Sequence, residues 1–199
     1  MLNPERVDMV RLRLGLTKIG FADLLEVDRR TINRFEAGSH DLPDSALKIL
    51  CKKSGYPSSF FEKSAPEYPD RTAVSFRSQR SLTAKARNAA LAVSALAFEL
   101  DDWISDRYSL PENKLVQTND MSPENAAIYL RVQWGIGLRP IGNMINLLEA
   151  HGVRIFSLTE ETRHLDAYSF WRNEKPYVFL NTLKTVSYTH LTLPTTPYV

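Results

Sequence analysis

The chain has 199 residues, a formal net charge of +2 and 43% hydrophobic residues, which suits one medium domain or two small ones with a packed core. Its single cysteine, Cys51, excludes an internal disulfide framework and fits a reducing compartment. The most apolar stretch, residues 89–98, is half the ~20 residues of a membrane helix, so we expect a cytoplasmic protein with no membrane segment.

Residues 1–61 show the hydrophobic spacing of a small all-α unit. Apolar side chains recur at helical intervals, and glycines follow the first and third predicted helices. Thr17 and Asp28 are placed as the N-caps of the second and third helices. Five short helices are therefore expected, over residues 4–14, 18–25, 29–37, 43–51 and 57–61.

The third of these helices carries a basic face. Its apolar pair, Ile32 and Phe35, indicates which side packs on the core. The opposite side then presents Arg29, Arg30, Asn33 and Arg34 together. Arginine pairs bidentately with guanine, and asparagine with adenine. For an isolated helix a solvated basic face would be the simpler interpretation. The choice between solvation and base recognition therefore depends on the preceding helix.

The two helices together resemble the helix-turn-helix of the XRE (Cro/C1-type repressor) family. The residues that stand at the positions of the family pattern are Leu16, Thr17, Lys18, Ala22, Thr31, Ile32, Asn33, Arg34, Phe35, Glu36 and Gly38. The resemblance implies a double-stranded DNA operator as partner and a homodimer that reads two half-sites. The DNA-binding residues it implies are Thr17, Lys18, Asp28, Arg29, Arg30, Thr31, Asn33 and Arg34.

Three residues depart from the family pattern. Lys18 replaces a glutamine that commonly bonds phosphate, although lysine still meets a phosphate as a charge. Glu26 stands where a turn glycine is common, and Gly20 lies inside a helix. We expect each of the last two to cost up to ~1 kcal/mol of stability.

Residues 62–81 are predicted to be a linker, because they begin with a proline-containing polar stretch and continue into a short extended segment. From residue 71 to residue 98 there are five basic residues and no acid, whereas seven acids and two bases follow between residues 99 and 124. Two solvated faces of opposite charge, or a basic strip beside a polyanion, are both compatible with this pattern.

Residues 82–185 indicate an α+β domain. Helices are expected over 82–107, 123–134 and 140–151, followed by strands over 153–158, 166–172 and 176–180. The turn Asn173-Glu174-Lys175 between the last two strands favours a small antiparallel sheet. The expected fold is therefore mainly α, with a five-helix Cro/C1-type helix-turn-helix domain ahead of a truncated α+β domain.

No catalytic or metal-binding constellation is visible in the sequence. Cys51, His40, His151 and His164 lie in different segments, with no second ligand at helical metal spacing. We therefore expect no catalytic residue, no metal site and no cofactor in this chain, and a surface or structural role for each histidine.

Residues 139–185 nevertheless resemble the N-terminal half of the ImmA/IrrE-type metallopeptidase domain. The similar segments are "RPIGNMINLLEAHGVRIFSL" and "LDAYSFWRNEKPYVFLNTLKT". In that family the last strand precedes a helix with an H-E-x-x-H motif, whose histidines bind zinc and whose glutamate is the general base. That motif is absent from this sequence. The resemblance thus implies zinc only in an intact parent protein, and truncation before the motif.

The last 14 residues, 186–199, contain no Lys, Arg, Asp or Glu. Residues 186–195 read as the translation of the transposon end and adapter of common sequencing libraries. We therefore expect this tail to be an adapter artefact, the authentic chain to stop near Thr185, and His190 not to be a ligand.

Three functions remain open at this level. The first is a DNA-binding transcriptional regulator with an incomplete metallopeptidase-like sensor domain. The second, for the parent protein, is a zinc metallopeptidase that cleaves a repressor. The third is an antitoxin-like autoregulator.

Overall fold

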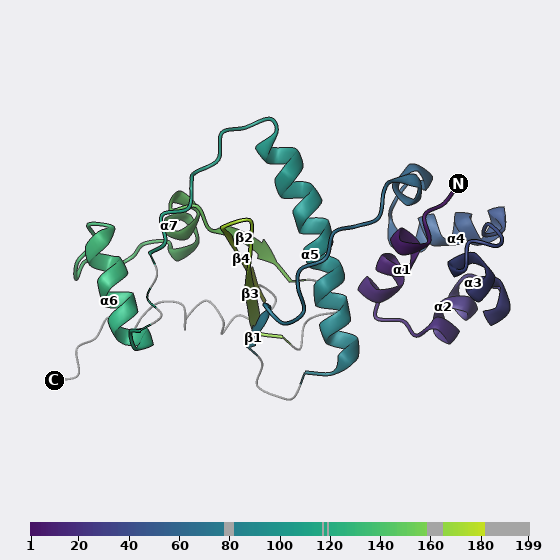
Figure 1. Cartoon of the computed structure of the whole chain (residues 1–199), viewed down its shortest axis with the longest axis horizontal. Helices are drawn as coiled ribbons and strands as arrows, with labels where there is room; N and C mark the ends of the chain where they lie inside the picture. The colour runs from purple at the N-terminus through teal and green to yellow at the C-terminus, as the bar shows by residue number, and fades with distance from the viewer. Residues whose placement is uncertain (78–81, 117, 119, 159–164, 182–199) are drawn as a thin grey trace.

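The computed structural model describes residues 1–77, 82–116, 118, 120–158 and 165–181. In this part of the chain, seven α-helices, one 3-10 helix and a four-stranded sheet are present (Figure 1). The helices are α1 Pro4–Arg13, α2 Lys18–Leu24, α3 Arg29–Glu36, α4 Asp44–Ser54, η1 Ser58–Glu62, α5 Ala84–Ser105, α6 Pro123–Gln133 and α7 Met144–Ala150. The strands are β1 Ser75–Arg77, β2 Arg154–Ser157, β3 Ala167–Arg172 and β4 Lys175–Leu180.

Helices α1 to α4 and η1 form an N-terminal helical unit, residues 4–62. The fifth expected helix is a 3-10 helix, in which Phe60 and Phe61 are buried. The helices converge on one apolar core, whose largest fully buried side chains are Met9, Val10, Phe21, Leu25, Ile32, Leu50 and Phe61. The elements expected in this region are therefore present, with the last of them in a tighter helical form.

The long helix α5 lies between the helical unit and the sheet (Figure 1). On one side Ala92 and Ala95 belong to the core of the helical unit. On the other side Ala90, Val93 and Phe98 pack on the aromatic side chains of the sheet. The small alanines let α1 approach α5 closely, so this helix contributes to both cores.

The sheet has the strand order β1-β3-β4-β2. β3 and β4 form an antiparallel hairpin whose turn residues, Asn173 and Glu174, both have positive φ, as a tight hairpin turn requires. β1 joins the other edge of β3 in antiparallel orientation. In contrast, β2 pairs with β4 in parallel.

The expectation of a purely antiparallel sheet is therefore wrong. Strands consecutive in the sequence are usually neighbours in a sheet, but β2 and β3 are not. Instead, the chain reverses direction between β2 and β3 and again between β3 and β4, so β2 and β4 run the same way. The β2–β4 pairing then makes the sheet mixed.

The helix that was expected from Pro140 begins later, at Met144. Asn143 is its N-cap, because its side-chain oxygen accepts a hydrogen bond of 3.0 Å from the backbone N–H of Asn146. α6 begins as expected, with Ser122 as the cap and Pro123 in the first turn. Among the described residues no helix has the length and apolar character of a membrane span.

Candidate nucleic-acid interface

The recognition helix predicted from the sequence is α3, and local bonds define both of its ends. At its start, the Asp28 carboxylate accepts a hydrogen bond of 2.8 Å from the backbone N–H of Thr31. This bond lowers the pKa of Asp28, so the cap is ionised at neutral pH. At its end, Gly38 takes a left-handed conformation with φ of 69°.

The two sides of α3 differ as the sequence predicted. Ile32 and Phe35 are each 2% exposed and belong to the core of the helical unit. The opposite face consists of four exposed side chains, Arg29, Arg30, Asn33 and Arg34. None of the four side chains makes a hydrogen bond or ion pair with another residue that the structure describes. Their donors are therefore free to meet a ligand.

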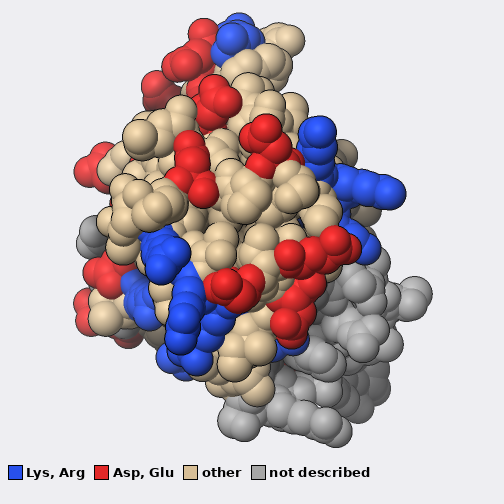
Figure 2. Space-filling model, turned by 90° about the vertical axis from the view of Figure 1, so that its right-hand side faces the viewer, with Lys and Arg blue, Asp and Glu red and all other residues tan. Residues whose placement is uncertain are grey.

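Figure 2 views the molecule from the side of the helical unit. Lysine and arginine side chains gather in separate groups there, with acidic side chains between them. The surface is thus patterned and not uniformly basic, in keeping with the net charge of +2. A polyanion would contact local basic groups on this face, without an extended positive electrostatic potential to attract it.

The start of α2 holds two more of the predicted DNA-binding residues, Thr17 and Lys18. Thr17 is its N-cap and accepts a hydrogen bond of 3.1 Å from the backbone N–H of Gly20. Lys18 forms an ion pair with Glu36 at the end of α3. Sequence reasoning used Glu36 only as part of the family pattern and missed this pair, because no local signal connects positions 18 and 36.

In the turn between α2 and α3, Glu26 adopts a backbone conformation that is unfavourable for residues other than glycine. Glu26 has φ of 57°, in the left-handed region. Its N–H donates to the carbonyl of Asp23, and the next N–H, of Val27, donates to the carbonyl of Ala22, which is the Schellman arrangement. α3 ends in the same arrangement with Gly38 at the equivalent position. The sequence-based expectation that Glu26 occupies a glycine position is confirmed.

Replacing Glu26 with glycine should therefore raise the free energy of unfolding of the helical unit by about 1 kcal/mol, because glycine adopts positive φ without steric cost. Urea unfolding followed by far-UV circular dichroism measures the change. Glu26→Ala is the matched control, since alanine removes the same charge and retains the unfavourable φ. An equal gain in both variants would assign the effect to charge and contradict the conformational explanation.

The candidate metal ligands are dispersed in the structure. His40 is exposed, Cys51 is half-buried in the helical unit, and His151 stacks on Trp134 with ring centroids 4.1 Å apart. Among the described residues, no three His, Cys, Asp or Glu side chains come together as a metal site would require. His164 and the tail 186–199, with His190, lie outside the described residues.

Comparison of the chain with protein-family models, with curated proteins and with solved structures found no match in any of the three.

Proposed function

We propose that this chain is a sequence-specific DNA-binding transcriptional regulator of the XRE (Cro/C1) type. In this proposal residues 1–61 bind a double-stranded operator, with α3 in the major groove and the start of α2 on the phosphate backbone. Two copies of the chain, each reading a half-site, supply the second recognition helix.

The observation that carries the proposal is the free polar face of α3. Arg29, Arg30, Asn33 and Arg34 are exposed and unpaired among the described residues, while Ile32 and Phe35 anchor the other side of the helix in the core. A basic face that only contacts solvent does not require a helix with defined ends. Here a charged cap at Asp28 and a glycine stop at Gly38 hold the helix at both ends. Such pre-organisation suits base readout, which requires side chains within hydrogen-bonding distance of base edges.

Lys18 is proposed to contact a phosphate only after it leaves its partner in the free protein. Its ammonium is paired with Glu36 in the free protein and would exchange that carboxylate for a phosphate on binding DNA. Thr17 and Lys18 begin α2, and the first turn of a helix is a favourable position for an anion.

Residues 82–185 are proposed to be the N-terminal part of an ImmA/IrrE-like domain. The order of α7, β2 and the β3–β4 hairpin supports this, since it follows the two segments that carry the resemblance. The residues present do not suit the zinc of that family, because the sequence has no H-E-x-x-H motif and the described histidines do not converge. We therefore assign no catalytic step to this chain.

An operator selected from randomised duplex DNA provides the test. Arg30→Ala should lose about 1–3 kcal/mol on that operator and relax the preference at one base position, because it removes a bidentate base contact. Lys18→Ala should weaken binding to every sequence alike and lower the salt-dependence slope by about one, because it removes a phosphate contact. Fluorescence anisotropy over a salt series measures both effects.

Lys114→Ala is the control for charge alone, because Lys114 lies in the segment between α5 and α6 and is exposed. It should leave operator binding unchanged. If Arg30→Ala loses as much affinity for random DNA as for the operator, Arg30 does not read bases and the assignment of α3 is refuted.

A further inference from the structure

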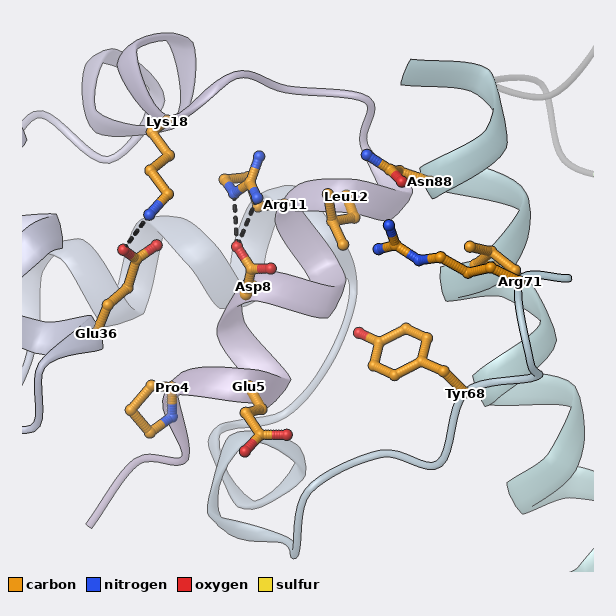
Figure 3. A pocket seen from close by; sticks show the side chains of 11 residues that line it. Pro4, Glu5, Asp8, Arg11, Leu12, Lys18, Glu36, Tyr68, Arg71 and Asn88 are labelled. Carbon is orange, nitrogen blue, oxygen red and sulfur yellow. Dashed lines mark hydrogen bonds and ion pairs between the residues drawn. The ribbon is translucent and has the colours of Figure 1, made fainter. Parts of the chain in front are cut away.

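A cavity of about 460 Å³ lies between the helical unit and α5. Its walls come from α1, the start of α2, the end of α3, residues 68 and 71 of the segment before β1, and α5 (Figure 3). This volume falls within the range of roughly 300–1,000 Å³ that is usual for small-molecule sites. The predicted DNA-binding surface does not account for it.

Two ion pairs on the cavity wall are already satisfied. Arg11 lies 2.6 Å from the Asp8 carboxylate and also donates to the backbone carbonyl of Leu16 at 2.7 Å. Lys18 is paired with Glu36. These four charged groups cancel one another, so they attract neither a net anion nor a net cation.

Four other polar side chains on the wall are not engaged. Glu5, Tyr68, Arg71 and Asn88 make no side-chain hydrogen bond or ion pair with any residue that the structure describes. Figure 3 shows the Arg71 guanidinium directed toward α1 and the Glu5 carboxylate on the far side of the Tyr68 ring. The cavity thus offers one free cation and one free anion among its described residues.

We propose that this cavity binds a small zwitterion with an apolar side chain, such as a free amino acid or a dipeptide, whose carboxylate is bound by Arg71 and whose ammonium is bound by Glu5. A guanidinium binds a carboxylate through two parallel hydrogen bonds, and a carboxylate accepts readily from an ammonium. A singly charged ligand would leave one of the two protein groups unmatched, whereas a zwitterion satisfies both.

The remaining wall residues fit the rest of such a ligand. Leu12 and Leu91 supply apolar surface for its side chain. The pKa of Tyr68 is raised to about 12, first by burial and then by the nearby carboxylates of Asp8 and Glu5. Its phenol is therefore a neutral donor at physiological pH and can bond the ligand carboxylate beside Arg71.

The segment that carries Tyr68 and Arg71 is held in place before any ligand arrives. Glu67 accepts hydrogen bonds of 3.0 and 2.6 Å from Arg172 of β3. Asp70 accepts bonds of 2.9 and 2.8 Å from the backbone N–H and hydroxyl of Thr72. The first contact anchors the segment to the sheet and the second defines its local turn, so part of the cost of ordering it is met before a ligand binds.

Occupancy of the cavity would also reach the proposed recognition helices. Lys18 and Glu36, which join the start of α2 to the end of α3, are themselves wall residues. A ligand that fills the cavity would lie against the wall that this pair helps to form and would alter the contact between these helices. This coupling rests on the proposed function, whereas binding of the zwitterion does not.

Isothermal titration calorimetry of the full chain with L-leucine and with the dipeptide Leu-Leu tests the binding. We expect at least one of them to bind with a dissociation constant of about 1 mM or below. N-acetyl-leucine lacks the ammonium and leucinamide lacks the carboxylate, so each should bind about tenfold more weakly or worse. Failure of both zwitterions to bind the wild-type chain would overturn the proposal.

Arg71→Gln and Glu5→Gln should each weaken binding of the zwitterion by about tenfold or more, because each removes one charged partner. Both positions are exposed, and circular dichroism verifies that the variants are folded. Lys52→Gln, on the exposed face of α4 and outside the cavity wall, is the matched control and should bind as wild type. If both cavity variants bind leucine as tightly as the control does, the site lies elsewhere and the proposal is refuted.

Operator affinity with and without the zwitterion separates this inference from the proposed function. A ligand that binds and changes operator affinity supports both the site and the coupling. A ligand that binds while no DNA is bound under any condition supports the site and refutes the proposed function. A ligand that binds without affecting operator affinity supports the site and refutes the coupling.

Discussion

Replacing Asp101 with alanine is expected to lower the free energy of unfolding of the sheet, with the α5 helix that covers it, by about 3–5 kcal/mol. Asp101 is 2% exposed and joins α5 to two strands. Its carboxylate lies 2.8 Å from the Arg154 guanidinium of β2 and accepts a hydrogen bond of 2.6 Å from the Tyr177 hydroxyl of β4. The alanine variant leaves a largely buried guanidinium and a buried hydroxyl without their acceptor, which is the costly case for an ion pair inside a protein.

Asp102→Ala is the matched control, because the neighbouring carboxylate is 51% exposed and pairs with Arg172 near the surface. Its loss should cost less than about 1 kcal/mol. Tryptophan fluorescence during urea unfolding measures both variants, since the three tryptophans, Trp103, Trp134 and Trp171, all lie outside the helical unit. Equal losses in the two variants would show that burial of Asp101 contributes nothing to the energy of its contacts.

Gly152→Ala is expected to destabilise the same region by about 3 kcal/mol. Gly152 has φ of 85°, which costs an alanine about 1–2 kcal/mol. A Cβ atom at this position would also collide with the backbone carbonyl of Glu112 and lie 2.6 Å from the Cα atom of Asn113. Backbone atoms cannot rotate away as a side chain can, so overpacking adds about 1–3 kcal/mol.

The close approach at Gly152 has a structural role. The segment after α5 is fastened here by a hydrogen bond of 3.0 Å from the N–H of Lys114 to the carbonyl of His151. Asn113 continues this contact by donating to the carbonyl of Glu174 in the β3–β4 turn, also at 3.0 Å. A side chain at position 152 would separate the end of α7 from this segment.

Gly135→Ala isolates the conformational part of the effect. Gly135 has a similar φ of 65°, but no atom lies within 4 Å of an added Cβ. This variant should lose only the cost of positive φ, about 1–2 kcal/mol. The difference between the two variants in the same unfolding experiment measures the steric part, and identical losses would contradict the collision with Glu112.

Short-range chemistry allowed several helices to be predicted. Thr17, Asp28 and Ser122 cap their helices by accepting hydrogen bonds from residues three positions later, so the cap and its partner lie in one short stretch of sequence. The two faces of α3 follow from helical periodicity in the same way, and the positive φ of Glu26 follows from its place just beyond α2. Arg29, Arg30, Asn33 and Arg34 are therefore exposed as expected, while their role in binding DNA stays a prediction.

Other features depended on segments that meet only in the folded chain. Leu100 and Trp103 are among the large apolar residues of α5, yet these two side chains are 48% and 51% exposed. The small alanines of α5, which add little to its hydrophobicity, are instead buried on two sides of the helix, because α5 packs between α1 and the sheet. A helix with two neighbours needs two contact faces, and its own periodicity does not reveal how many neighbours it has.

The sequence by itself determined where α2, α3 and α6 begin, which residues cap them and which face of α3 is apolar, because these properties arise from bonds and spacing within a few residues. The tertiary structure alone decided the parallel pairing of β2 with β4, the Lys18–Glu36 pair, the burial of Asp101 and the cavity walled by Glu5 and Arg71. Each of these joins residues at least 18 positions apart in the sequence. Such contacts form only when several packed elements fix the two partners at once, so no local pattern specifies them.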